Sequence, residues 1–264
     1  MKRYTLSRIS LMLLLTFTLF TYSCSQKKTD SIFQTSTIDA LIVGVYDGDF
    51  TFGELKEKGD FGLGTFNHLD GEMIGLEGIF YQVKSDGSVH IVPDSMKTPF
   101  SAVTFFKSDK VETIDKPLSC KELKEHLVST FPTKNISYGI KVTGDFSYIK
   151  VRSVPEQEKP YPPLTQVVKE ESKFEYENVK GTIVGFWLPG YLKNVNVVGF
   201  HFHFVSTDQK AGGHVLECNL GNSIVEIDYI RDIEISLPDT QTFNKADLEK
   251  IESGDVKDVE GKKK

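Results

Sequence analysis

The stretch at 199–214 constrains the fold of this chain more than any other, because it combines strand-like alternation with three histidines. Residues 199–206 read Gly-Phe-His-Phe-His-Phe-Val-Ser. Side chains alternate between the two faces of a strand, so His201 and His203 are expected on one face and the phenylalanines on the other. The polar residues that follow end in two glycines, as a hairpin loop does, and His214 opens the next strand. The sequence therefore predicts a β-hairpin on which three imidazoles converge.

Three imidazoles form the donor set of a catalytic zinc site, in which three protein ligands leave one position open to water or substrate. The alternative is a chance His-x-His, because the chain contains six histidines. A third histidine placed one hairpin turn away favours a metal site over chance. We expect His201, His203 and His214 to bind a metal ion, with zinc as the first choice, although imidazole also suits iron, copper and nickel.

The N-terminal segment has the features of an export signal. Basic residues precede an apolar run at 9–20, which is too short for an ordinary membrane-spanning helix. A small residue then precedes Cys24, which resembles a bacterial lipoprotein signal even though Thr21 stands where such signals usually carry leucine. The resemblance implies a signal peptide at 1–23, lipid attachment to Cys24 and a polar tether at 24–37. We therefore expect a lipoprotein of the bacterial cell envelope; the alternative is an ordinary secretory signal and a secreted or periplasmic protein.

Composition sets limits on the core and on the partners. Aromatic residues make up 11% of the chain, which favours a strand-rich, well-packed core. A formal net charge of −6 gives no basic footprint for nucleic acid, so we expect no nucleic-acid partner, and membrane contact only through the lipid anchor.

Cys120 and Cys218 could pair in an exported protein. They lie far apart in the sequence, however, and Cys218 falls in an expected core strand, so two buried free thiols are the favoured interpretation.

Short apolar segments separated by glycine- and proline-containing turns predict an α+β fold that is mostly β. A Pro-Tyr-Pro-Pro stretch at 160–163 interrupts regular structure and marks the expected domain boundary. Residues 38–163 are expected to form an N-terminal mixed β-sheet domain with short helices. Residues 164–264 are expected to form a small β-barrel-like domain that carries the metal hairpin and a C-terminal arm. The local predictions are a buried strand at 40–46, a helix begun by a Thr51–Glu54 capping box, a second helix at 119–128, two strands at 137–154 and a short helix at 244–251.

Two charged residues outside the hairpin are candidates for a site. Glu72 lies in a stretch rich in glycine and aspartate at 59–78, just before the apolar Met73. If Glu72 is buried, its pKa rises and it can donate a proton near neutral pH; the alternative is a solvated turn residue. Arg152 lies at the end of a strand, where its guanidinium can bind a carboxylate through two hydrogen bonds; the alternative is a surface arginine.

Together these segments resemble the alpha-acetolactate decarboxylase family over residues 38–261. The motifs that carry the resemblance are Thr-Phe-Gly-Glu-Leu at 51–55, Gly-Asp-Phe-Gly-Leu-Gly-Thr-Phe-Asn at 59–67, Leu-Asp-Gly-Glu-Met at 69–73, Arg152 with Val154 and Pro155, the hairpin strand at 199–205 and Gly-Gly-His-Val at 212–215. The resemblance implies an enzyme that converts acetolactate to acetoin and carbon dioxide, with zinc as its cofactor. It also implies a homodimer whose sheets join across the interface. The export signal departs from the many members that are cytosolic.

The same resemblance implies roles for single residues. The three hairpin histidines are implied as zinc ligands, and Thr65, Glu72 and Arg152 as residues of the substrate pocket. A glutamate from the C-terminal tail enters the site in this family, and Glu260 is its best match in this chain, with Glu252 nearby as the alternative.

Two other functions remain open on the sequence. A His-x-His in a strand-rich chain is also found in cupin-like metal dioxygenases, but those place a glutamate shortly after it, where this chain has Thr207 and Asp208. The other function is that of a non-catalytic metal-binding surface lipoprotein, which would bind zinc tightly without turning over acetolactate.

Overall fold

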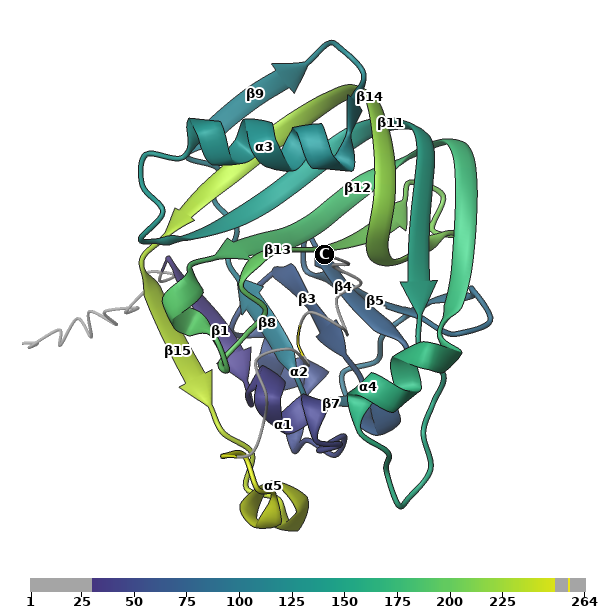
Figure 1. Ribbon diagram of the computed structural model, residues 1–264, viewed down its shortest axis with the longest axis vertical. Coiled ribbons are helices and arrows are strands. Elements are labelled where there is room, and N and C mark those ends of the chain that lie inside the picture. Colours follow the sequence, from purple (N-terminus) through teal and green to yellow (C-terminus); the bar gives the residue numbers. More distant parts are fainter. Residues whose placement is uncertain (1–29, 250–255, 257–264) are drawn as a thin grey trace, which may run out of the picture.

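Two β-sheets that pack against each other make up most of the molecule (Figure 1). The computed structural model of the chain describes residues 30–249 and residue 256. Among these residues the first sheet has seven strands in the order β15-β1-β8-β3-β4-β5-β6. Their bounds are Ser31–Thr35 (β1), Phe61–Thr65 (β3), Glu72–Leu76 (β4), Ile79–Val83 (β5), Val89–Ile91 (β6), Ser101–Thr104 (β8) and Asp232–Ser236 (β15). A separate two-stranded ribbon consists of β2 (Phe50–Thr51) and β7 (Lys97–Thr98).

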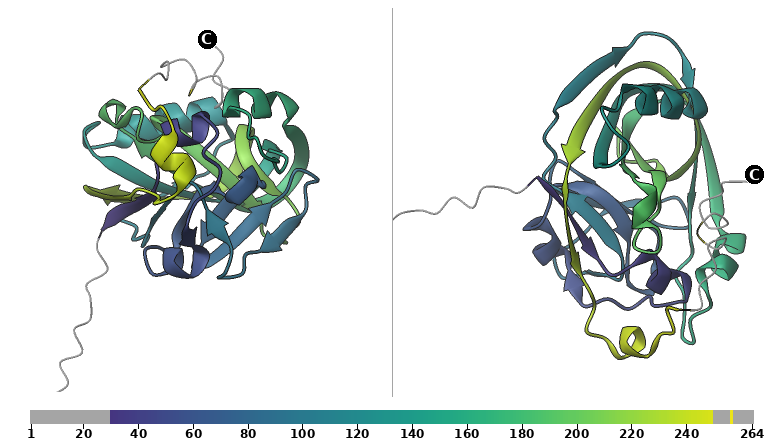
Figure 2. Two further views of the ribbon diagram at one scale, coloured as in Figure 1. Left: turned by 90° about the horizontal axis from the view of Figure 1, so that it is seen from below. Right: turned by 60° about the vertical axis from the view of Figure 1, so that its left-hand side comes forward.

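The second sheet is built around four strands that close on themselves. The strands of this sheet are β9 (Lys110–Ile114), β10 (Leu118–Ser119), β11 (Ser137–Ser153), β12 (Ser172–Leu188), β13 (Gly199–Ser206) and β14 (Gly212–Ile230). β14 pairs with β11, β11 with β12 and β12 with β13, and β13 returns to the first residues of β14, each pair being antiparallel. The strong curvature of these strands is visible in Figure 2. Their closed pairing brings the start of β14 between β13 and the end of β11.

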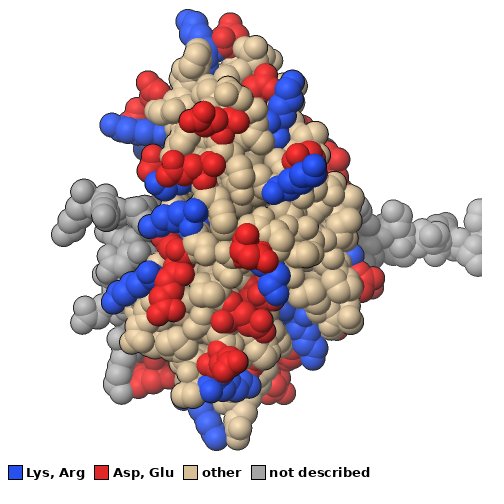
Figure 3. All heavy atoms as spheres, turned by 90° about the vertical axis from the view of Figure 1, so that its right-hand side faces the viewer, with Lys and Arg blue, Asp and Glu red and all other residues tan. Residues whose placement is uncertain are grey.

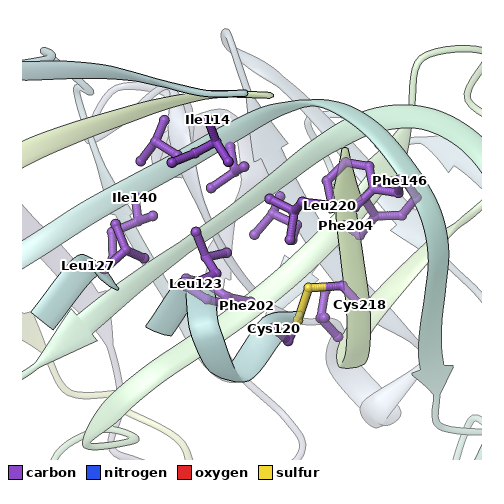
Figure 4. Packing of buried hydrophobic residues seen from close by; sticks show 14 of the residues in the cluster. Ile114, Cys120, Leu123, Leu127, Ile140, Phe146, Phe202, Phe204, Cys218 and Leu220 are labelled. Carbon is purple, nitrogen blue, oxygen red and sulfur yellow. A yellow bond between two sulfur atoms is a disulfide. The ribbon is translucent and has the colours of Figure 1, made fainter. Parts of the chain in front are cut away.

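Helix α3 (Cys120–Thr130) packs across the curved second sheet (Figure 4). Ser119 and Glu122 form a capping box at its first turn, which satisfies backbone N–H groups that would otherwise lack partners. Leu123 and Leu127 are fully buried in one cluster with apolar side chains of the sheet. The helix predicted at 119–128 is therefore confirmed.

The remaining helices among the described residues are short. They are α1 (Ile38–Ile42), α2 (Phe52–Lys56), α4 (Leu164–Val167) and α5 (Gln241–Lys245), with 3-10 turns η1 (Asn67–Leu69), η2 (Val168–Glu170) and η3 (Gly190–Leu192). The capping box predicted at Thr51 and Glu54 is confirmed at the start of α2. Within the described part of the chain, no helix combines the length and the apolar character needed to cross a membrane.

Several local predictions are wrong. The strand expected at 40–46 is replaced by α1, which Thr37 caps by accepting a hydrogen bond from the Ala40 N–H. Every residue of α1 is buried, so the sequence shows no helical alternation of polar and apolar positions there. β11 runs unbroken where two strands were expected, because the segment around Gly144 forms a bulge in its pairing with β14 and not a turn. The expected C-terminal helix lies earlier, at α5; residues 250 and 251 are outside the described range.

The structure has strands at the expected tether and across the expected domain boundary. Residues 31–35, assigned to the tether, form β1 between β8 and β15, and Ile32 and Phe33 are buried there. Residues 31–35 therefore belong to the first sheet, where the sequence had indicated part of a tether. β11 and β12 lie on either side of the boundary expected at 163 and are neighbours in one sheet. The α+β, mostly β class is confirmed, and the division into two domains stays a prediction.

The two later cysteines form a disulfide, so the prediction of free thiols is wrong. The Cα atoms of Cys120 and Cys218 are 4.9 Å apart although 98 residues separate them in the sequence. Figure 4 shows the bond joining the first turn of α3 to β14. Separation along the chain was a poor guide, because the long β14 returns to the helix that precedes β11.

Candidate active site

A pocket between the two sheets gathers the candidate residues. Thr65 and Glu72 reach it from β3 and β4 of the first sheet, and Arg152 and the three histidines reach it from the second sheet. Apolar side chains complete its wall: Ile38, Leu41, Leu69, Phe100, Val154, Leu164 and Val168. The pocket thus combines a small polar cluster with a largely apolar wall, which is the usual composition of a small-molecule site.

The hairpin holds the three imidazoles together as the alternation predicts. His203 and His214 are directly opposite each other in the β13–β14 pairing. The ring centroids are 5.0 Å apart for His201 and His203, 5.0 Å for His201 and His214, and 5.3 Å for His203 and His214. One ligand nitrogen from each residue lies within 4.8 Å of the others, so the group can hold a metal ion.

The ring of His203 is held in one orientation by the neighbouring sheet. Its Nδ1 lies 2.7 Å from the carbonyl oxygen of Met73 in β4. A carbonyl only accepts, so Nδ1 carries the proton and Nε2 keeps the lone pair that a metal needs. His203 Nε2 is also 3.5 Å from Glu72 Oε2, which places the carboxylate beside the triad.

His214 is neutral for a clear physical reason. Its side chain is buried, and burial lowers its pKa well below the ordinary histidine value by disfavouring the charged form. The positive charge of Arg152 on the adjacent strand lowers the pKa further. A neutral imidazole is the form that binds a metal, so His214 needs no proton release before binding.

Glu72 and Thr65 lie side by side at the edge of the pocket. They are partners in the β3–β4 pairing and are 7% and 4% exposed. The structure therefore excludes the solvated turn residue that was the alternative for Glu72. Thr65 Oγ1 donates a hydrogen bond of 2.7 Å to the carbonyl oxygen of Gly71, which fixes the turn that leads into Glu72.

Arg152 also lies inside the molecule and not on its surface. It is opposite His214 in the β11–β14 pairing and only 4% exposed. Its Nη1 donates to Glu171 Oε2 at 2.7 Å. The sequence does not identify Glu171 as a site residue, because the run from Lys169 to Glu171 has the charged composition of a solvated turn. No local pattern distinguishes Glu171 from its charged neighbours.

Two predicted residues lie outside the described part of the chain: Glu260 and Cys24. Asp208, which stands near the position of the cupin glutamate, is exposed in the hairpin loop and accepts a hydrogen bond from Ser206 Oγ. The loop carboxylate is thus engaged within its own turn.

Known proteins match the chain over most of its length. The family profile described as alpha-acetolactate decarboxylase matches residues 32–250. The alpha-acetolactate decarboxylase of Methylococcus capsulatus is 45% identical over 229 residues, covering 87% of this chain and 88% of that protein. The corresponding protein of Brevibacillus brevis is 43% identical over 233 residues, covering 88% of this chain and 82% of that protein.

A solved structure agrees with the fold as well as with the sequence. The crystal structure of alpha-acetolactate decarboxylase from Bacillus subtilis strain 168 superimposes with a TM-score of 0.86 at 39% identity, covering 87% of this chain and 99% of that one. The resemblance found from the motifs is confirmed. On the profile, the relatives and the shared fold, the chain belongs to the alpha-acetolactate decarboxylase family.

Proposed function

We propose that this protein converts acetolactate to acetoin and carbon dioxide, with a zinc ion held by His201, His203 and His214. The observation that carries the proposal is the meeting of the histidine group with buried Glu72 and Arg152 in one pocket of a chain of this family. These residues supply a metal site, a carboxylic acid and a cation for an anionic substrate.

The histidines fit zinc by the chemistry of their donors. The Met73 carbonyl selects the tautomer of His203, and burial keeps His214 neutral. Three neutral imidazoles are the ligand set of open, catalytic zinc sites, in contrast to closed cysteine-rich structural sites. When bound, zinc supplies a Lewis acid for the negative charge that develops on the substrate oxygens, a contribution of several kcal/mol.

Arg152 gives the pocket its affinity for a carboxylate. The substrate carries a carboxylate on the carbon next to a ketone, and a guanidinium binds such a group through parallel hydrogen bonds. Breaking the carbon–carboxylate bond leaves the electron pair as an enediolate and releases carbon dioxide. The positive charge of Arg152 is positioned to stabilise that anion within an apolar wall, where water screens it little.

A carboxylic acid must then return a proton to carbon. Glu72 is buried beside the histidines and is the described residue placed to donate it. We propose Glu260 as a second carboxylate of the site. Two carboxyl groups close to one metal titrate as a coupled pair. The proton is therefore assigned to the pair, and single variants of each residue identify the donor.

The test of this function is direct. The purified protein should contain about one zinc per chain and form acetoin and carbon dioxide from racemic acetolactate, and a chelator should abolish turnover. Tight zinc binding without acetoin would indicate a non-catalytic metal-binding protein. Oxygen uptake with bound iron would instead indicate a cupin-like dioxygenase.

Glu72→Gln tests the proton donor. The amide keeps the shape of the side chain but has no acidic proton, so zinc content should stay at the wild-type level while kcat falls by about 100-fold or more. Metal analysis and single-turnover product formation check both expectations. Wild-type turnover in this variant would reject Glu72 as the proton donor and leave Glu260 as the candidate.

Export, lipid attachment and dimer formation are further parts of the proposal. The Cys120–Cys218 disulfide supports export, because disulfides persist mainly in oxidising compartments. Incorporation of labelled palmitate that Cys24→Ser abolishes would establish the anchor, and recovery of the unlabelled protein from the soluble fraction would contradict it. Light scattering of the purified protein gives the oligomeric state, for which a homodimer is expected.

A further inference from the structure

The ion pair between Arg152 and Glu171 is the feature of the pocket that the proposed reaction leaves unexplained. Arg152 Nη1 donates to Glu171 Oε2 at 2.7 Å, and the two side chains are 5% and 13% exposed. The other carboxylate oxygen of Glu171 is 3.0 Å from Lys173 Nζ, whose side chain is half exposed. Glu171 therefore holds a buried guanidinium with one oxygen and is itself held near the surface by the other.

In this arrangement one donor of the guanidinium bonds to Glu171 and another is left for a different partner. The Nη1 donor is committed to Glu171, while the buried Nε of Arg152 has no hydrogen-bond partner among the described residues. A buried donor without a hydrogen-bond partner lowers the stability of the folded protein. Because Arg152 lines the pocket, its Nε–H is available to donate to a bound ligand. Arginine binds carboxylates in a planar, two-point manner, and that geometry fails if the guanidinium rotates.

Glu171 also ties Arg152 to the pocket wall. It directly follows η2, and the α4–η2 segment before it contributes Leu164 and Val168 to the wall. On the other side, Arg152 pairs with Lys173 across β11 and β12. One carboxylate thus links the guanidinium, the apolar wall and the start of β12.

We propose that Glu171 is a positioning residue that fixes the guanidinium of Arg152 so that its remaining donors meet the carboxylate of the substrate. The proposal rests on the proposed decarboxylase function for the identity of that carboxylate. The orientation of Arg152 is a property of the protein alone and can be measured without substrate.

The first test reads Arg152 directly. The whole chain contains four arginines, so protein labelled with nitrogen-15 at arginine gives a simple spectrum of Nε–H signals, and loss of one signal in Arg152→Lys assigns it. Burial protects this N–H from exchange with water, and the wild type should show it at neutral pH. Glu171→Ala should shift or broaden the signal, Glu171→Gln should retain it because the amide oxygen still accepts, and Glu170→Ala, an exposed neighbour, should leave it unchanged.

The second test reads substrate binding. Glu171→Ala should raise KM for acetolactate by about tenfold or more with zinc content unchanged, because a charge-assisted hydrogen bond to the substrate is misaligned. Glu171→Gln should stay within about threefold of the wild type, which also keeps the test valid if removal of a buried ion-pair partner in Glu171→Ala prevents folding.

The outcomes separate the two proposals. An unchanged Arg152 signal and unchanged KM in a folded Glu171→Ala variant would overturn the positioning role while leaving the decarboxylase function intact. Wild-type values for Glu171→Ala and a loss in Glu171→Gln would overturn it as well. If the wild-type protein forms no acetoin but Glu171→Ala changes the Arg152 signal as expected, the substrate assignment is refuted and the positioning role stands.

Discussion

At the scale of single residues, the site depends on side chains whose partners lie on another sheet. Alternation along β13 places His203 correctly, yet its orientation comes from the carbonyl of Met73 in β4. Such hydrogen bonds in the second coordination sphere typically contribute a factor of 10–100 in metal affinity, roughly 1–3 kcal/mol. The histidines alone therefore describe only part of the proposed metal site.

His203→Ala should remove zinc and activity together, because two imidazoles are too few to hold the ion tightly. Elemental analysis and the acetoin assay on the same preparation provide the measurement. His90→Ala is the matched control, since His90 is exposed and the hydrogen bond described for its ring is with the nearby Ser88. Activity persisting in zinc-free His203→Ala protein would contradict a role for the metal.

Asp228 gives a pH-dependent stability that can be tested away from the pocket. Burial, together with the nearby Asp30 and Asp109, raises the pKa of Asp228 to about 7, although the hydrogen bond from the Lys107 N–H lowers it. The native state therefore holds a proton that the unfolded chain releases near pH 4, and stability is lost as pH rises from about 4 to about 7. Asp228→Asn should raise the free energy of unfolding at pH 8 by an amount on the order of 1–3 kcal/mol, and by less at pH 5.

Urea denaturation at both pH values provides the measurement for Asp228. Asp115→Asn, on an exposed residue, is the control and should show little change at either pH. A gain for Asp228→Asn that is equal at pH 5 and pH 8 would show that the carboxyl does not titrate in this window.

At the scale of elements, the metal hairpin depends on the close approach of β14 to β11. Gly213 has φ of +135°, in a region that favours glycine, and a Cβ added there would lie 2.5 Å from the carbonyl oxygen of Arg152. This oxygen belongs to the backbone of β11, which cannot move aside as the end of a flexible side chain can. The residue before His214 is therefore restricted to glycine by its backbone conformation and by its neighbouring strand.

Gly213→Ala should push β14 away from β11 next to His214 and weaken zinc binding by about tenfold or more, because ligand positions shift. Competition with a chromophoric chelator measures the affinity. Gly190→Ala is the control, since an added Cβ there meets open space. Equal zinc affinity in the two variants would show that the strand contact does not set ligand geometry.

The elements also show what sequence could and could not reveal. The two-residue period of residues 200–204 and the capping boxes at Thr51 and Ser119 are local signals, and local structure follows them. α1 was missed because burial on all sides removes the polar face that identifies a helix. Glu171 and the Met73 carbonyl were missed because their roles arise only when distant strands meet.

At the scale of the whole molecule, the charges on one face are mixed and a disulfide cross-links the second sheet. Acidic and basic side chains are interspersed on the face shown in Figure 3. The disulfide closes a loop across 98 residues that includes α3, β11, β12 and β13. A covalent link across so much of the second sheet restricts the unfolded chain strongly.

Replacing Cys120 and Cys218 together with serine should lower the free energy of unfolding by about 2–5 kcal/mol, the range for a long disulfide-closed loop. Urea denaturation followed by the fluorescence of Trp187, the single tryptophan of the chain, measures the difference. Zinc content at 25 °C serves as the check that the native fold is retained. Coincident denaturation curves for the variant and the oxidised wild type would contradict the expected stabilisation.

The position of the pocket between the sheets has a consequence for how such a site can change. The proposed metal ligands belong to one sheet and the proposed acid to the other. All three proposed ligands then come from the second sheet, with only the orientation of His203 set by Met73 of the first, whereas the delivery of a proton depends on how the two sheets fit together. Substitutions along the contact between the sheets can slide the acid relative to the metal and so retune the reaction for a different hydroxy-keto acid without rebuilding the ligand set.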